Sequence, residues 1–329
     1  MMEDPMTGAL VPFNFDHLAM QVPELMRFDV QLDTESFDEA VDSSDMEIGH
    51  WKRIANLIGS KYGDYDGFVI LHGTDTMAYT ASALSYMLPN LKKPVILTGS
   101  QLPIGVLRTD GKENLITSIQ IASMKKEGQP IVQEVAIYFG SELFRGNRTF
   151  KYSTEDFDAF DSPNYTELAN AGIHVFFHFD DLLRSEGVFE VKTDMCNSVA
   201  VLRVVPGLKP EVLNAIIAVK GLKGLILETY GSGNVMTHDW FLESIENAVK
   251  GGLVVVNVTQ CNRGFVEQGK YETSTRLSEL GVTSAGDMTL EASYTKLMHL
   301  LSYETDTSKV AQCMIKPIAG EITNFSALV

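Results

Sequence analysis

Cysteine is scarce in this chain of 329 residues: its three cysteines, Cys196, Cys261 and Cys313, are far apart in the sequence. No two of them have CxxC spacing, so the sequence predicts neither a disulfide framework nor a zinc site. A chain of this length can bury a large apolar core without such cross-links. The cysteine pattern therefore favours a reducing compartment, and we expect the protein to be cytoplasmic.

Long apolar runs and an excess of positive charge are also missing. No stretch approaches the roughly 18 apolar residues that a membrane-spanning helix needs, and the N-terminus lacks the basic and apolar regions of a signal peptide. The 43 acidic residues outnumber the 26 basic ones, which gives a formal net charge of −17. A protein that binds a nucleic-acid backbone needs a basic face. We therefore expect neither a membrane nor a nucleic acid as a partner.

The sequence does contain a repeated order of short apolar runs, loops and helical periods. Three apolar runs lie at 67–72, 94–98 and 134–139. They show no polar alternation, which is typical of parallel strands covered on both faces. Helical spacing follows the first run and resumes near Asp110, which forms a capping pattern with Glu113. The alternation of strands and helices predicts an α/β fold.

The alternation lapses between about 180 and 198, where the sequence is acidic and irregular, and it restarts afterwards, with a strand expected over 224–229. This break divides the chain into a larger and a smaller part. We expect a larger N-terminal parallel-sheet domain over 1–180, a linker over 181–198 and a smaller C-terminal α/β domain over 199–329. The larger domain would carry most of the candidate site, because the most informative motif follows its first apolar run.

That motif is HGTDT at His72–Thr76. In open α/β sheets, ligands bind at the carboxyl ends of the strands, and a turn there offers backbone N–H groups to an anion. Thr74 and Asp75 add a hydroxyl and a carboxylate to this turn. Either side chain could instead cap the helix that follows. The spacing alone leaves both interpretations open.

The surrounding stretch GFVILHGTDTM at Gly67–Met77 resembles the second signature of bacterial-type L-asparaginases. Other stretches resemble that family in the expected order, and especially its cytoplasmic, type I branch. They are DSSDM at 42–46, LTGSQLP at 97–103, LFRGNRTFK at 143–151, YGSGN at 230–234, VTQC at 258–261 and GDMTLEA at 286–292. The resemblance covers essentially the whole chain. It implies an asparaginase-like fold, hydrolysis of L-asparagine to L-aspartate and ammonia without a cofactor or metal, and a homodimer or homotetramer.

The resemblance further implies a catalytic triad of Thr74, Asp75 and Lys151. A threonine hydroxyl is a poor nucleophile, so a neighbouring base must accept its proton. Desolvation favours the neutral amine of a lysine, which suits this role. Asp75 would hold the lysine and bind the substrate amino group. Thr74 could be the nucleophile, activate a water or relay a proton, and the sequence leaves these roles open.

Four further residues match the substrate-binding positions of the family. Ser43, Ser44 and Asp45 match the loop that grips the substrate carboxylate with hydroxyl and backbone N–H groups. Without the resemblance, the same residues indicate a turn before a helix. Ser100 matches a position whose backbone faces the departing ammonia.

The first departure from the family concerns its opening strand, which ends in TGGT followed by Ile or Val. The first threonine of that signature is the favoured nucleophile, yet TGG occurs nowhere in this sequence. Thr7 does not match it. Either the sequence continues upstream, or the chain has lost its first strand and primary nucleophile. We expect the former, because losing a central strand would leave buried hydrogen-bonding groups unpaired, at a cost of about 1–3 kcal/mol each. Without the signature, we expect greatly reduced asparaginase activity.

The second departure concerns an asparagine-sensing site that cytoplasmic relatives can carry. Its threonine, arginine, asparagine and cysteine positions hold Phe150, Glu228, Asn234 and Cys261 in this chain. Phe150 removes a hydroxyl, and Glu228 puts an anion where an arginine would pair with a carboxylate. We therefore predict a hyperbolic dependence of the rate on asparagine.

Two other functions stay open. One is an amidohydrolase that prefers glutamine, and the other is a non-catalytic protein that binds asparagine or aspartate. The amidase subunit of a tRNA-dependent amidotransferase would need an RNA-facing module and a basic surface, which the length and the charge of −17 do not supply.

Overall fold

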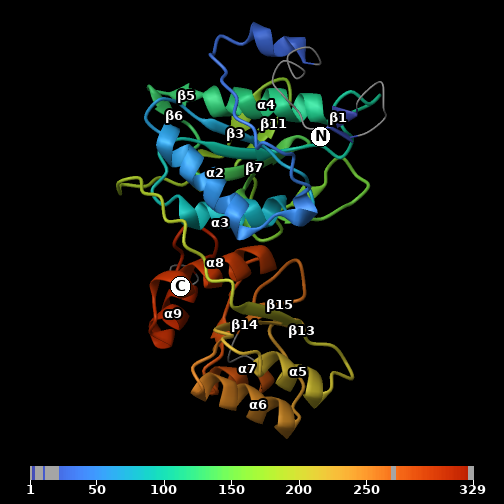
Figure 1. Ribbon diagram of the computed structural model, residues 1–329, viewed down its shortest axis with the longest axis vertical. Helices are drawn as coiled ribbons and strands as arrows, with labels where there is room; N and C mark the ends of the chain where they lie inside the picture. The colour runs from blue at the N-terminus through green and yellow to red at the C-terminus, as the bar shows by residue number, and fades with distance from the viewer. Residues whose placement is uncertain (1, 4–9, 12–21, 268–271, 325–329) are drawn as a thin grey trace. The chain divides into compact units, whose positions relative to one another are not determined.

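The computed structural model describes residues 2–3, 10–11, 22–267 and 272–324. The chain divides into two compact units (Figure 1). The first unit comprises Met1–Ser162 and Thr166–Val191, and the second comprises Pro163–Tyr165 and Lys192–Val329. The change from one unit to the other after Val191 falls within the stretch expected to be a linker. That three residues near 164 group with the second unit was not expected from the sequence.

A six-stranded sheet forms the centre of the first unit (Figure 1). In spatial order its strands are β12 (Val175–Phe177), β11 (Ala169–Ala171), β8 (Glu142–Arg145), β7 (Val135–Phe139), β4 (Val95–Thr98) and β3 (Phe68–Leu71). Strands β3, β4 and β7 run parallel, whereas β8, β11 and β12 are joined by antiparallel pairs. The predicted α/β class, with the larger domain first, is confirmed.

The sheet of the larger domain, expected to be parallel, is mixed: two of its five neighbouring strand pairs are parallel and three are antiparallel. Only Gly140 and Ser141 connect β7 to β8, and a two-residue connection can join antiparallel strands but not parallel ones. Gly140 has φ +63°, the left-handed conformation that such tight hairpins use. The Gly-Ser pair between two apolar runs is the sequence signal for this hairpin.

Strand β3 ends the described sheet and pairs on one side only, with β4. Its sequence predicts cover on both faces, yet Leu71 is 45% exposed and the rest of β3 is half-buried, whereas all of β4 is buried. One face does pack, since Val69 contacts the cluster of Val22, Leu25 and Leu115. The prediction of a strand buried on both faces is therefore wrong for the residues that the structure describes. Among them, the outer edge of β3 has no partner strand.

Three α-helices and several short elements complete the described part of the first unit. The helices are α2 (Ile48–Lys61), α3 (Met77–Met87) and α4 (Gly111–Ser123). The 3-10 helices are η1 (Pro23–Arg27), η2 (Ser43–Asp45), η3 (Gly146–Arg148) and η4 (Phe179–Asp181). The two-residue strands are β1 (Met2–Glu3), β2 (Leu10–Val11), β5 (Lys125–Lys126), β6 (Gln129–Pro130), β9 (Phe150–Lys151) and β10 (Phe160–Asp161). Helix α3 is almost wholly buried, which fixes the turn immediately before it.

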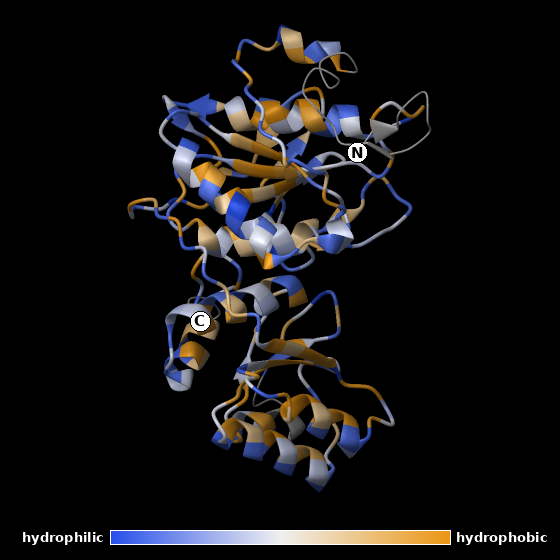
Figure 2. Cartoon of the chain, in the orientation of Figure 1, coloured by the Kyte–Doolittle hydropathy of each residue, from blue (hydrophilic) through white to orange (hydrophobic). Residues whose placement is uncertain are grey.

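The second unit has a parallel sheet in the order β13 (Val199–Arg203), β14 (Gly224–Thr229), β15 (Val254–Thr259) and β16 (Thr283–Ser284). Its described helices are α5 (Pro210–Ile217), α6 (Asp239–Lys250), α7 (Glu272–Glu279), α8 (Leu290–Tyr303) and α9 (Thr307–Met314). Figure 2 shows β15 in orange, the colour of hydrophobic residues, and shows both hydrophilic blue and hydrophobic orange along α6. Helix α6 buries Phe241, Ile245 and Ala248 on one face, at the spacing of an amphipathic helix.

A buried ion pair links α8 to the chain that follows α9. Lys296 Nζ lies 2.5 Å from Glu321 Oε1, and both side chains are fully buried. The same ammonium group donates to the backbone carbonyls of Met314 and Lys316. Such a pair is costly to break, because removing one partner leaves an uncompensated buried charge.

Among the described residues, no helix combines the length and the apolar content needed to cross a membrane.

Candidate active site

The HGTDT turn connects the carboxyl end of β3 to the start of α3. Thr76 is the N-cap residue of α3, and no side chain caps that helix end. The capping interpretation of Thr74 and Asp75 is therefore not borne out. Thr76 Oγ1 instead donates to the carbonyl oxygen of Ser43 at 2.6 Å, which ties the turn to η2.

Lys151 reaches this turn from β9, 76 residues further along the chain than Asp75. Its Nζ donates to Thr74 Oγ1 at 2.8 Å and to Asp75 Oδ1 at 2.6 Å. The lysine side chain is 18% exposed and the aspartate side chain is 63% exposed. Charge-assisted bonds of this length are strong and directional. The three side chains expected to form a triad thus meet in one polar cluster, with an amine on the inner side and an accessible carboxylate on the outer side.

The predicted carboxylate-binding loop lies directly against this turn. A Cβ atom added at Gly73 would come 2.6 Å from Ser43 Oγ, so only glycine fits there without a shift. Ser43 itself is buried, whereas Ser44 and Asp45 are exposed.

Within that loop, one acceptor already holds Ser44. Both its backbone N–H and its hydroxyl donate to Asp42 Oδ1, each at 2.9 Å. These two hydrogen bonds hold the pKa of the Asp42 carboxyl below its usual value, because they stabilise its charged form. The loop is therefore shaped by Asp42, which was not among the residues expected to act in the site.

The loop that contains Ser100 follows β4 and is organised by Asp110. We expected Asp110 to cap α4, but its carboxylate makes no capping bond there. Its two oxygens accept instead from the backbone N–H of Gln101, at 3.0 and 2.9 Å, and one also accepts from Leu102 at 3.1 Å. Asp110 does occupy the N-cap position of α4, but the expected side-chain capping bond is missing because two backbone donors of the preceding loop occupy the carboxylate.

A chain of hydrogen bonds that begins on α2 also supports the HGTDT turn. Trp51 Nε1 donates to Thr80 Oγ1 at 2.9 Å, Thr80 Oγ1 lies 2.9 Å from His72 Nε2, and His72 Nδ1 lies 2.6 Å from the Gly73 carbonyl. A carbonyl can only accept, so Nδ1 carries the proton and Nε2 accepts from the threonine hydroxyl. Burial lowers the pKa of His72, which favours this neutral form. The position of the histidine before Gly73 is the only signal in the sequence that could have pointed to these bonds.

The residues predicted for a second, sensing site are divided between the units. Phe150 belongs to the first unit, and the other three belong to the second. Glu228 lies opposite Arg203 in the last residue pair between β14 and β13. Its Oε1 lies 3.5 Å from Arg203 Nη1. Asn234 pairs with Tyr230 through the backbone, and Cys261 is exposed. Arg203 therefore places a positive charge beside this anion, which was not expected from the sequence.

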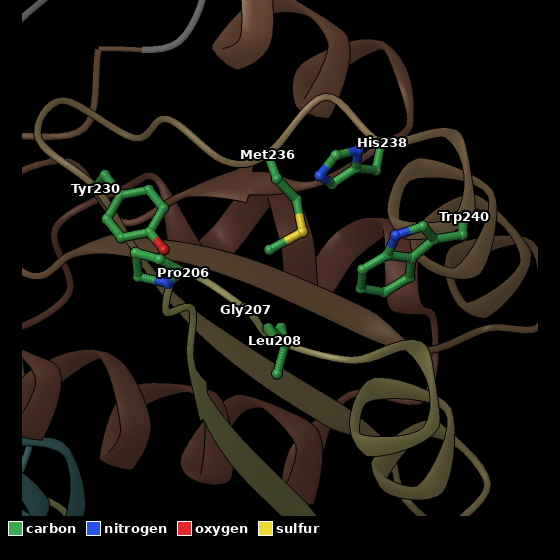
Figure 3. A pocket seen from close by; sticks show the side chains of 7 residues that line it. All are labelled: Pro206, Gly207, Leu208, Tyr230, Met236, His238 and Trp240. Carbon is green, nitrogen blue, oxygen red and sulfur yellow. The ribbon is translucent and has the colours of Figure 1, made fainter.

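The second unit also contains a cavity of about 410 Å³ (Figure 3). Its lining consists of Pro206, Gly207, Leu208, Tyr230, Met236, His238 and Trp240. None of the residues predicted for chemistry lines this cavity. His238 and Trp240 are stacked with ring centroids 6.5 Å apart. The aromatic, sulfur-containing lining differs in chemistry from the amine and carboxylate cluster of the first unit.

Comparison with known proteins assigns both units. Residues 1–182 match the family model described as Asparaginase, N-terminal, and residues 198–314 match the Glutaminase/Asparaginase C-terminal domain. L-asparaginase 1 of Escherichia coli (strain K12) is 43% identical over 302 residues, which are 92% of this chain and 86% of that protein. The crystal structure of L-asparaginase I from Vibrio cholerae superposes with a TM-score of 0.86 at 38% identity, covering 94% of this chain and 92% of the other.

A relative with a different name matches an even larger share of the chain at lower identity. It is one of the subunits of the glutamyl-tRNA(Gln) amidotransferase of Pyrococcus abyssi, 35% identical over 333 residues, which cover 97% of this chain and 73% of that protein. Two α/β units with a lysine, a threonine and an aspartate at a strand end, together with these relatives, define an enzyme of the amidohydrolase class. The chain belongs to the bacterial-type asparaginase family.

Proposed function

We propose that the protein hydrolyses L-asparagine to L-aspartate and ammonia at the cluster of Thr74, Asp75 and Lys151. One observation carries the proposal: a largely buried amine lies within hydrogen-bond distance of both a hydroxyl and an exposed carboxylate. This is the spatial relation that a nucleophile, its base and the residue orienting that base require. The names of the relatives support asparagine as the amide.

In this proposal Lys151 acts as the base in its neutral form. Its amine accepts a proton through the Thr74 hydroxyl as a threonine oxygen attacks the side-chain amide carbon of asparagine. Lys151 then passes this proton to the amide nitrogen, which leaves as ammonia, and an acyl-enzyme ester remains. Water attacks the ester and loses a proton to the same base, which returns it to the threonine oxygen as aspartate leaves. General-base assistance of this kind is typically worth about 10²–10⁴-fold in rate.

The loops around the cluster would bind the two ends of the amino acid. The exposed carboxylate of Asp75 is positioned to pair with the α-amino group of the substrate. The turn of Ser43, Ser44 and Asp45, tied to Thr76, would bind the α-carboxylate. The backbone of Ser100, in the loop held by Asp110, would face the departing ammonia. We also propose that the enzyme works in the cytoplasm and forms a homodimer or homotetramer. Analytical ultracentrifugation would measure the mass of this assembly.

The open edge of β3 bears on which threonine attacks. That edge has no partner among the described residues, although β3 carries the apolar sequence of an inner strand. A parallel strand paired there would end beside the HGTDT turn, at the same edge of the sheet. A threonine at the end of such a strand, as in the family signature TGGT, would be the attacking group, with Thr74 relaying its proton to Lys151.

The test is ammonia release from L-asparagine by the chain of 329 residues and by the same chain preceded by an apolar strand ending in TGGT. We expect much faster release from the extended chain. Equal turnover by both forms would contradict the role of the added threonine and leave Thr74 as the nucleophile. Calorimetric binding of aspartate without ammonia release by either form would instead favour a binding protein. Faster release from glutamine than from asparagine would favour the glutamine-preferring alternative.

A further inference from the structure

One side chain outside the predicted triad touches the Thr74 hydroxyl. Thr74 Oγ1 donates to Gln101 Oε1 at 3.3 Å, which is long for a hydrogen bond between two oxygens. Gln101 lies in the loop after β4, beside Ser100. No role was expected for it from the sequence, although it is part of the LTGSQLP stretch.

The orientation of the Gln101 amide is determined by its other partners. Its Nε2 donates to the carbonyl oxygen of Asp156 at 3.0 Å and approaches that of Ser153 at 3.5 Å. Carbonyl oxygens only accept, so the amide nitrogen must face them and the amide oxygen must face Thr74. The backbone N–H of Gln101 is fixed as well, because both oxygens of Asp110 accept from it.

Gln101 therefore joins three loops of the first unit. Its side chain contacts the turn after β3 on one side and the loop after β9 on the other, and its backbone is anchored to the start of α4. Ser153, in the loop after β9, lies two residues beyond Lys151. The same amide thus spans the two segments that carry the hydroxyl and the amine.

The protonation of Lys151 determines where the Thr74 hydroxyl can donate. A charged ammonium group has no lone pair, so while Lys151 donates to Thr74 Oγ1 the hydroxyl proton needs another acceptor. Gln101 Oε1 is an acceptor within reach of that oxygen. Once the amine is neutral, the hydroxyl proton can turn toward it instead.

We propose that Gln101 is a positioning residue that holds the Thr74 hydroxyl proton while Lys151 is charged and yields it to Lys151 when the amine is neutral. The inference rests on the proposed function of this cluster. The charged groups that face it are Asp75 on the lysine, Asp110 on the glutamine backbone, and Asp156, whose carboxylate accepts from the Ser153 hydroxyl at 3.0 Å. A change at Gln101 leaves all three carboxylates in place, although it alters the bond from the Gln101 amide nitrogen to the Asp156 backbone carbonyl.

Two substitutions of similar size test the proposal with opposite expected results. Gln101→Met removes the acceptor, so the hydroxyl loses its alternative partner and the charged state of the cluster becomes less favourable. The acid limb of the pH profile of kcat should then move to lower pH, by about 0.5–1 unit. Gln101→Glu places an anion on the same side, which should move the limb about one unit to higher pH. Both should lower kcat about tenfold or more with KM changed by less than about threefold.

A second measurement makes the test independent of turnover. An amine-acylating reagent, followed by peptide mass spectrometry, reports the pH at which Lys151 becomes reactive, and the midpoint should move in the same two directions. Gln133→Met is the control, because Gln133 is a half-buried glutamine of the same unit that donates to the Pro130 carbonyl. Its midpoint should equal that of the unmodified chain.

The outcomes separate this inference from the proposed function. If the unmodified and the extended chain both release no ammonia from asparagine, the proposed function fails, while the labelling midpoints still decide the role of Gln101. If the enzyme is active and neither variant moves the acid limb or the midpoint, or both variants move it in the same direction, the positioning role is overturned. Thermal unfolding of each variant identifies any that fail to fold. Gln101→Asn, which keeps the amide group, then replaces the failed variant in the labelling experiment. Its labelling midpoint should shift to lower pH by less than that expected for Gln101→Met.

Discussion

The two units present the carboxyl ends of parallel strands in different ways. In the first unit, side chains from the turn after β3 and from β9 are bonded to one another through the Lys151 amine. In the second unit, three polar side chains at the same kind of edge donate to backbone carbonyls. Thr259 Oγ1 donates to Gly231, Asn257 Nδ2 to Gly233, and Gln260 Nε2 to Val204 and Glu228.

This difference shows that the strand edge alone does not make a reactive site. A side chain whose donors satisfy loop carbonyls stabilises the loop and has little left for a substrate. An amine whose partners are a hydroxyl and an exposed carboxylate can exchange protons with both. The comparison predicts that substitutions at the first edge affect catalysis, whereas those at the second affect stability.

The largest effect is expected for Lys151→Met. Removing the base should lower kcat/KM for asparagine by about 10²–10⁴-fold, and thermal unfolding should change little, since the side chain is not in the apolar core. Steady-state ammonia release measures the first quantity. Lys250→Met is the matched control, because Lys250 is exposed on α6 and pairs only with Glu246 in the described structure. A loss of less than tenfold for Lys151→Met would break the comparison.

Asn257→Leu should show the opposite behaviour at the second edge. Asn257 is buried, accepts from Thr229 Oγ1 at 2.6 Å and donates to the Gly233 carbonyl at 3.1 Å. The substitution removes the donor of the Gly233 carbonyl and leaves the Thr229 hydroxyl with its longer bond of 3.4 Å to the Val258 carbonyl. At about 1–3 kcal/mol for a buried group that loses its partner, plus a smaller loss at Thr229, the free energy of unfolding should fall by about 2–4 kcal/mol. Urea denaturation measures this change. Asn247→Leu, at an exposed position of α6, is the control, and equal destabilisation by both would count against the argument.

How much the sequence could predict follows from the same contrast. The apolar run of β14 predicts its observed bounds, and the meeting of Thr74, Asp75 and Lys151 follows from a resemblance that covers long motifs. The bonds of Gln101 and Asp110 were not predicted, because each depends on where a distant or neighbouring loop places a backbone group. The antiparallel pairing of β8 with β7 was also missed, because the α/β alternation around it predicts parallel strands.

A pH-dependent effect is expected from Glu291, in the first turn of α8. Burial raises the pKa of this carboxyl to about 7, and the nearby charge of Glu228 adds to the rise. The folded state therefore keeps a proton that the unfolded state releases, so this stabilisation is complete below about pH 4.5 and is lost as the pH rises toward 7.

Glu291→Gln removes that dependence. The variant should gain about 1–3 kcal/mol in unfolding free energy relative to the unmodified chain when the pH rises from about 4.5 to about 8. Denaturation at both pH values measures the gain. Glu279→Gln, at the end of α7, is the comparison variant and should show no such gain. If the unfolding free energy changes between the two pH values by the same amount in Glu291→Gln as in the unmodified chain, the result would contradict the assigned burial.

The smallest effect concerns the residues at the predicted sensing positions. With Phe150 and Glu228 in place of a threonine and an arginine, the dependence of the rate on asparagine should be hyperbolic, with a Hill coefficient near one. Arg203 beside Glu228 partly offsets the negative charge, so Glu228→Arg tests whether the anion is the reason. A Hill coefficient clearly above one in the unmodified enzyme would contradict this prediction.

A double-mutant cycle between Thr74 and Lys151 tests most directly whether the amine and the hydroxyl act together in one proton transfer. The measurement is kcat/KM for asparagine in Thr74→Val, in Lys151→Met and in the variant with both changes. Residues that transfer one proton between them lose their effect together, so the double variant should be no slower than about the slower single variant. Losses that multiply, with each change acting as though the other were absent, would contradict the account.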